Sequence, residues 1–284
     1  MTVPEVPARG LRVGLALGGG GARGYAHIGV IDVLIEHGFE IAAVAGSSMG
    51  ALVGGLYAAG QLEPYGAWVR TIGQREVLRL LDPRLRGPGA SGAEKVMARV
   101  GELIGDAQIE DLPIPFTAVA TDLLARRAVW FQRGPLTTAI RASIALPPAI
   151  TPVVVEGRLL SDGGLMDPVP IAPIASAAVD TIVAVSLNGL RGNGLPVSVR
   201  KPAGGSYQAE SLPAGLRKID MVNLSMEAVS ALLTRYRLAA LPPDLLIEVP
   251  VDACGTLDFH RAEEMIELGR ASAQEALARS GLES

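Results

Sequence analysis

Residues 46–50 read Gly46-Ser47-Ser48-Met49-Gly50, and they join the apolar run 41–45 to the helix-like stretch 51–60. A serine between two glycines, where a buried strand turns sharply into a helix, is how a hydroxyl is exposed as a nucleophile. The glycines serve a steric purpose, because such a turn strains the backbone and side chains at its flanks would collide. The same pattern also arises by chance in a chain with 34 glycines. Ser48 is therefore a candidate nucleophile whose role depends on the rest of the sequence.

The composition favours a folded chain, with length for one large α/β domain or two small ones, that does not bind nucleic acid. The 284 residues, 49% of them apolar, are enough for one large core. The 25 basic and 29 acidic residues give a net charge of −4 without a long block of like charge, which argues against nucleic acid as a partner. The single cysteine, Cys254, excludes an intramolecular disulfide, and three histidines leave little for a structural zinc site.

The N-terminal segment and the hydropathy pattern predict a cytoplasmic protein. Residues 1–10 read as a tail with charges and prolines, and they lack the apolar core of a secretory signal. Glycines at 18–21 break the apolar run that follows, and no segment of the sequence reaches the roughly 18 to 20 uninterrupted apolar residues that span a bilayer. We expect at most transient, peripheral contact with a membrane surface.

Strands and helices alternate from the start of the chain. Apolar runs predict strands at 11–17 and 41–45, followed by helices at 22–37 and 49–60, and this order implies a parallel sheet with right-handed crossovers. Later strands are expected at 116–120, 127–132, 153–155, 158–160, 181–187 and 245–249, and later helices at 64–73, 91–104, 135–143, 219–238 and 258–277. We interpret 11–284 as a single domain, in which 74–92 is a cap or loop and 188–215 is a flexible loop rich in glycine and proline.

A second motif, Gly18-Gly19-Gly20-Gly21-Ala22-Arg23-Gly24, also lies between a strand and a helix. Backbone amides without side chains, at the positive end of a helix, bind anions. The spacing from Gly19 through Gly21 to Gly24 matches a dinucleotide-binding fingerprint, whereas the same amides also suit the oxyanion of an ester intermediate. A dinucleotide site needs an acidic residue at the end of the second strand, and that strand ends in Ala45-Gly46-Ser47. The oxyanion interpretation is therefore favoured.

A serine nucleophile needs a base, and two residues are candidates. Asp162 lies in Asp162-Gly163-Gly164, where two glycines allow the backbone to approach a neighbouring strand end, although the same triplet is typical of a simple turn. His260 follows Ser48 and Asp162 in the chain order of an α/β-hydrolase triad, but its place at an expected helix start suits a surface or capping role equally well. His27, in the helix after the glycine loop, is expected to be structural. Spacing alone leaves a dyad and a triad open.

The three motifs in this order resemble the bacterial branch of the patatin-like phospholipase family. The resemblance rests on Gly19-Gly20-Gly21-Ala22-Arg23-Gly24 with His27, then Gly46-Ser47-Ser48-Met49-Gly50, then Asp162-Gly163-Gly164. It extends to the stretches 111–116, 120–122, 140–144 and 167–170, and so covers roughly residues 11–190. The helix after Leu257-Asp258-Phe259-His260 matches more weakly.

The resemblance implies a three-layer α/β/α fold with a mostly parallel central sheet and a Ser–Asp dyad that hydrolyses acyl esters of lipids. Carried over by motif, Ser48 is the nucleophile, Asp162 is the base, and no cofactor is needed. The amides of Gly19, Gly20 and Gly21 supply the oxyanion hole, and Arg23 holds that loop or orients a phosphate. Gly24, Gly46, Met49, Gly50, Gly163 and Gly164 support the motifs. The expected partner is a lipid or phospholipid, with phospholipase A or lysophospholipase activity.

Two departures from the family pattern and two other functions accompany this interpretation. The glycine loop has four glycines where the family has three, which leaves the choice of oxyanion amides open. Pro147-Pro148 stands where relatives often have a proline followed by glycine, which affects the acyl pocket but not the dyad. The alternatives are a patatin-fold signalling or scaffold protein with negligible turnover and, third, a dinucleotide-binding protein. The sequence does not specify an oligomeric state.

Overall fold

The structure is a computed structural model that describes residues 10–80, 93–147, 150–192 and 218–282. The tail expected at 1–9, residues 81–92 of the expected cap and residues 193–215 of the expected flexible loop lie outside this part of the chain. Among the described residues, no helix is long and apolar enough to cross a membrane.

A mixed sheet forms the centre of the fold. Its described strands follow the order β5-β6-β3-β2-β1-β7-β8, and β4 pairs with β3. The parallel strands are β1 (Arg12–Leu17), β2 (Glu40–Ser47), β3 (Phe116–Asp122), β7 (Thr181–Gly189) and β8 (Leu245–Pro250). The antiparallel ones are β4 (Arg127–Phe131), β5 (Val153–Val155) and β6 (Arg158–Asp162). β1, β2 and β3 are buried along most of their length, as expected for strands covered on both faces.

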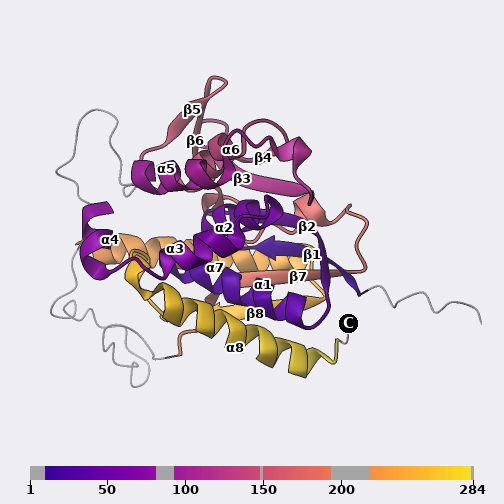
Figure 1. The fold of residues 1–284 in the computed structure, drawn as a ribbon. Coiled ribbons are helices and arrows are strands. Elements are labelled where there is room, and N and C mark those ends of the chain that lie inside the picture. The colour runs from indigo at the N-terminus through magenta and orange to yellow at the C-terminus, as the bar shows by residue number, and fades with distance from the viewer. Residues whose placement is uncertain (1–9, 81–92, 148–149, 193–217, 283–284) are drawn as a thin grey trace, which may run out of the picture.

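Helices cover both faces of this sheet, so the fold has the expected three α/β/α layers. Helices α1 (Ala26–Glu36), α2 (Met49–Ala58) and α8 (Ala262–Ser280) share one large apolar core with β1 and β2. Helix α7 (Lys218–Ala240) covers the opposite face, where Leu238 packs on a smaller cluster that includes Ala16, Ala45 and Ala184. Figure 1 shows α1 and α8 in front of the strands and α7 behind them.

The remaining helices lie on the side of the larger core. They are α3 (Leu62–Val69), α4 (Gln74–Leu80), α5 (Ala93–Ile104) and α6 (Leu136–Ser143). Residues 74–80, the first part of the cap or loop expected at 74–92, form a helix. Val77 is buried in the core, so an apolar contact distant in sequence supports this short helix. The helix expected at 22–37 is also divided, because residues 21–25 form a 3-10 turn before α1 begins.

Strand β3 brings two distant parts of the chain together. Ala118 pairs with Gly46 of β2 on one edge and with Phe131 of β4 on the other, while Ala120 pairs with Asp162 of β6 and with Val129 of β4. Because β4 occupies one edge of β3, β2 and β6 must share the other. β2 ends where Ser47 pairs with Val119, and β6 ends where Asp162 pairs with the next residue, Ala120. The turn after Ser47 and the turn after Asp162 thus meet end to end.

The glycines around Ser48 allow a close approach of backbone segments. A Cβ on Gly46 would lie 2.2 Å from the carbonyl oxygen of Gly50, and a Cβ on Gly50 would lie 2.1 Å from that of Leu17. Both contacts are far inside van der Waals distance, and both involve backbone that sits in the sheet or in the turn itself. Larger residues at 46 and 50 are therefore incompatible with this turn.

We expect Gly50→Ala to lower the free energy of unfolding by roughly 3 kcal/mol or more, because the added methyl group overlaps fixed backbone. Gly101→Ala in α5 is the matched control: a Cβ there meets nothing within 4 Å, and alanine favours a helix by up to about 1 kcal/mol. Urea unfolding of both variants checks the prediction. Equal stability of the two variants would contradict the packing described for the turn.

Candidate active site

Ser48 occupies a strained position between β2 and α2. Its φ of 56° and ψ of −124° are unusual for a residue with a side chain, and they are typical of a strand-to-helix nucleophile turn. The side chain is buried, with 8% of the residue exposed, and lies at the N-terminus of α2, where negative charge is favoured. Ser47 is used differently, because its hydroxyl donates to the carbonyl oxygen of Asp167 at 2.6 Å. Of the two serines, it is Ser48 that has the backbone geometry typical of a nucleophile.

Asp162 is the hydrogen-bond partner of Ser48. The Ser48 hydroxyl donates to Oδ2 of Asp162 at 2.5 Å, and the Gly164 amide donates to Oδ1 at 2.8 Å. Burial raises the pKa of Asp162 to about 6, although these two hydrogen bonds act in the opposite direction. The carboxylate is thus oriented through both oxygens and is more basic than an exposed aspartate.

The glycines that flank this pair permit close contacts. A Cβ on Gly163 would lie 2.1 Å from the Val119 carbonyl oxygen, so only glycine brings the Asp162 turn against β3. A Cβ on Gly24 would lie 2.3 Å from Cβ of Met49, so Gly24 allows the glycine loop to pack against the start of α2. A Cβ on Gly19 would lie 3.2 Å from Cβ of Ser48, which places this loop directly beside the serine.

The hydrogen bonds of the glycine loop narrow the choice of oxyanion donors. The Gly19 amide donates to the Pro168 carbonyl oxygen at 3.0 Å and is therefore occupied, which disfavours the expected role of Gly19 as an oxyanion donor. The Gly18 amide is also occupied, by the Val185 carbonyl oxygen. For the amides of Gly20 and Gly21 no acceptor is found within the described part of the chain. These two amides are the candidate oxyanion donors that remain in the loop.

Arg23 anchors the glycine loop. Its Nη1 donates to the carbonyl oxygens of Val251 at 2.6 Å and Cys254 at 3.4 Å, and the residue is 4% exposed. The guanidinium is thus directed at the segment after β8, a geometry that favours the expected role of Arg23 in holding the loop over contact with a phosphate or an oxyanion.

The three histidines all lie within the described residues, and none of them forms a hydrogen bond with the Ser48 hydroxyl. His27 is fully buried, its Nε2 donates to the Gly18 carbonyl oxygen at 2.8 Å, and burial lowers its pKa to about 4. His37 follows the C-terminus of α1, and His260 lies in the 3-10 turn 259–261. None of them lines either of the two cavities at Ser48. The geometry favours the dyad over the triad, and it agrees with a structural role for His27.

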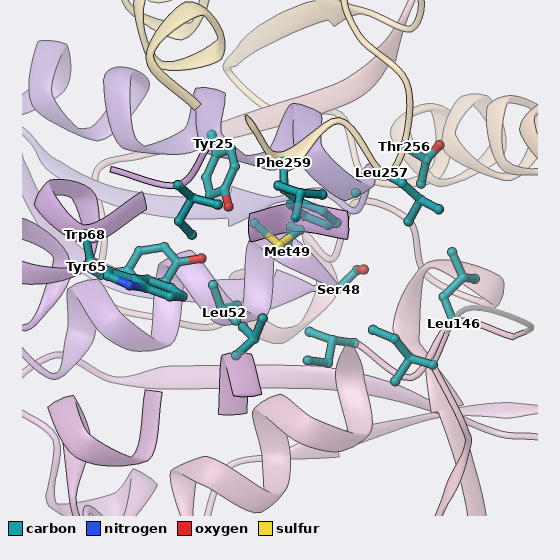
Figure 2. A pocket seen from close by; sticks show the side chains of 16 residues that line it. Tyr25, Ser48, Met49, Leu52, Tyr65, Trp68, Leu146, Thr256, Leu257 and Phe259 are labelled. Carbon is teal, nitrogen blue, oxygen red and sulfur yellow. The ribbon is translucent and has the colours of Figure 1, made fainter. Parts of the chain in front are cut away.

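Two cavities of different character meet at Ser48. The first is almost entirely apolar, and Figure 2 shows Ser48 between Tyr65 and Trp68 on one side and Leu146 on the other. The second is more polar and includes Ser48, Asp162 and the glycine loop, together with Asn188 of β7 and Ser230 of α7. An ester bond at Ser48 can therefore direct an acyl chain into one cavity and a polar alcohol into the other.

One polar residue behind the site, Ser143, is not distinguished by any motif in the sequence. Ser143, fully buried at the end of α6, accepts a hydrogen bond from the Ser48 amide at 2.9 Å and donates to the Val119 carbonyl oxygen at 2.6 Å. It lies in the stretch 140–144 that carries part of the family resemblance, but no local pattern distinguishes it from an ordinary helix residue.

Within the described residues, no group of three or more side chains suited to a metal ion is present.

Comparison with known proteins assigns the family. The family model described as patatin-like phospholipase matches residues 15–175. An uncharacterized NTE family protein of Mycobacterium tuberculosis is 43% identical over 328 aligned positions, which cover 94% of this chain and 91% of that protein. The chain therefore belongs to the patatin-like phospholipase family, and by class it is a lipid acyl hydrolase.

A fungal relative is more distant in sequence, and one solved bacterial structure shows a weaker similarity. A lysophospholipase of Emericella nidulans is 30% identical over 279 aligned positions, which cover 94% of this chain but only 18% of that longer protein. The crystal structure of VipD from Legionella pneumophila aligns with 96% of this chain and 67% of that chain, with a TM-score of 0.48 and 12% identity.

We expect His260→Ala to leave kcat for ester hydrolysis within about twofold of wild type, because the residue does not line the cavities at Ser48. Steady-state kinetics with a p-nitrophenyl acyl ester check this. A loss of several orders of magnitude, which removal of a triad histidine produces, would instead support a catalytic triad that includes His260.

Proposed function

We propose that this protein hydrolyses acyl esters of lipids, with Ser48 as nucleophile and Asp162 as general base. The observation that carries the proposal is the 2.5 Å hydrogen bond from the Ser48 hydroxyl to the buried Asp162 carboxylate, at the junction of an apolar and a more polar cavity. This contact joins a nucleophile directly to a base, as nucleophilic catalysis requires.

In the first half of the reaction, Ser48 Oγ bonds to the ester carbonyl carbon as its proton passes to Oδ2 of Asp162. Negative charge develops on the carbonyl oxygen, and we assign its stabilisation to the amides of Gly20 and Gly21 and to the N-terminus of α2. When the tetrahedral intermediate collapses, the bond to the alcohol breaks and the alcohol leaves with the proton from Asp162. The acyl group is then held on Ser48.

In the second half, Asp162 removes a proton from water, and the resulting hydroxide equivalent attacks the acyl carbon. The second tetrahedral intermediate collapses with release of the carboxylic acid, and the proton on Asp162 returns to Ser48 Oγ. A raised pKa of about 6 suits both halves, because the group must accept and return a proton near neutral pH. No cofactor takes part in these steps.

The cavities support a phospholipid or lysophospholipid as substrate. The apolar cavity at Ser48 suits a single acyl chain, and the more polar cavity suits the glycerol and headgroup of the leaving alcohol. The lysophospholipase name of the fungal relative supports the same substrate class. We place the reaction at a lipid surface that the protein contacts transiently. A non-catalytic scaffold is disfavoured, because it has no need of a strained Ser48 or of a desolvated carboxylate.

Ser48→Ala and Asp162→Asn should each abolish hydrolysis of a p-nitrophenyl acyl ester and of lysophospholipid, because each removes one partner of the proton transfer. Circular dichroism should be unchanged for both. At pH 8, Asp162→Asn should also have a free energy of unfolding equal to that of wild type or higher by up to about 3 kcal/mol, because it removes a buried charge. Full turnover by either variant would refute the proposed pair.

The rate should depend on pH through the ionisation of Asp162. The base must be deprotonated, so kcat/KM should rise with pH through about 6 and reach a plateau above it. Stability should change in the opposite sense: the folded-state pKa lies above the unfolded value of 3.8, so ionisation between about pH 4 and 6 destabilises the fold as pH rises. Burial raises the pKa of Asp167 to about 6 as well, so only the kinetic profile reports on Asp162 alone. A rate that is constant from pH 5 to 8 would contradict the assignment.

A further inference from the structure

The end of helix α6 contacts both members of the proposed pair. Ser143 accepts a hydrogen bond from the Ser48 amide at 2.9 Å, and two residues later the Ala145 carbonyl oxygen accepts from the Asp162 amide at 3.0 Å. The Ala145 oxygen also accepts from the Ser161 hydroxyl at 2.6 Å. Ser143, Ala145 and Ser161 are all fully buried, so these bonds do not compete with solvent.

Ser143 satisfies a backbone group that the turn would otherwise leave unpaired. With φ at 56°, Ser48 has left the ladder of β2, and its amide lies before the first hydrogen bonds of α2. Ser143 Oγ accepts from this amide and, through its own proton, donates to the Val119 carbonyl oxygen at 2.6 Å. One hydroxyl therefore connects the strained turn to strand β3.

The link to Val119 has a geometric consequence for the base. Val119 is the neighbour of Ala120, which pairs with Asp162, and the Val119 carbonyl is also the group against which Gly163 packs. The Ser48 backbone is thus connected through Ser143 to the Val119 carbonyl of β3, and the Asp162 turn packs against the same carbonyl. Displacement of Ser48 by a fraction of an ångström would lengthen its hydrogen bond to Asp162 without moving the carboxylate.

We propose that Ser143 is a positioning residue for the reaction, which fixes the Ser48 backbone relative to Asp162 through the Val119 carbonyl, and that the Ala145 carbonyl fixes the Asp162 backbone from the same segment. The inference rests on the proposed Ser48–Asp162 function. Ser143 does not touch substrate, because it is fully buried and lines neither cavity at Ser48. Ile144 and Leu146, in contrast, line the apolar cavity, so the segment 143–146 joins the support of the pair to the wall of the acyl site.

The test compares Ser143→Ala and Ser143→Cys with wild type in p-nitrophenyl ester hydrolysis across pH. Alanine removes both hydrogen bonds and should lower kcat by roughly tenfold to a hundredfold with little change in KM, since misplacement of a reacting group by about 1 Å costs that much. Cysteine keeps a weak donor and acceptor and should give an intermediate kcat. In Ser143→Ala the rise of kcat/KM with pH should move to higher pH, because the hydrogen bond from Ser48 that holds the pKa of Asp162 down is weakened.

The matched control is Thr181→Val, which removes another buried hydroxyl, at the start of β7, where it donates to Asp244 at 3.3 Å. Thermal unfolding of all variants measures the loss of stability. If Ser143→Ala is destabilised but retains the kcat and the pH dependence of wild type, Ser143 is structural and the proposal is overturned. If Ser48→Ala retains full activity, the proposed pair fails instead, and that result is separate from the behaviour of Ser143.

Discussion

One edge of strand β3 is the constraint on which the site depends. β2 runs parallel to β3 and ends beside Val119, while β6 runs antiparallel to it and ends beside Ala120. Two strands that approach each other along one edge must stop before they collide, and each stops in a tight glycine turn. The geometry brings Ser48 and Asp162 within 2.5 Å although 114 residues separate them in the chain.

The same arrangement stores free energy in the site. Ser48 adopts a backbone conformation that most residues avoid, and Asp162 is held away from water, which raises its pKa. Both features cost stability, and the large apolar core shared by α1, α2 and α8 offsets that cost. Under the proposed mechanism they are also what makes the serine accessible and the carboxylate basic. The glycine loop lies beside Ser48, and Arg23 anchors it.

Local patterns predicted most of the strands and helices and made Ser48 a candidate nucleophile, whereas the pairing of Ser48 with Asp162 and the three-layer fold came from the family resemblance. Apolar runs such as 41–45 and 181–187 lie in buried strands, and the glycines at 46, 50 and 163 mark places where backbone segments touch. Long-range hydrogen bonds were beyond such patterns. The occupied amide of Gly19, the carbonyl partners of Arg23 and the hydrogen bond from the Ser48 amide to Ser143 all join residues at least 95 positions apart. The helical conformation of residues 74–80 was also beyond local patterns, because it depends on the packing of Val77 in a core made of distant residues.

The most direct test of the central claim is labelling with a fluorophosphonate probe, followed by mass-spectrometric mapping of the modified residue. The account predicts a single modified serine, Ser48, with a labelling rate that rises with pH through about 6 and falls to background in Asp162→Asn. Modification of Ser47 or of another serine would contradict it. Labelling of Ser48 at an undiminished rate in Asp162→Asn would show that Asp162 is not its base.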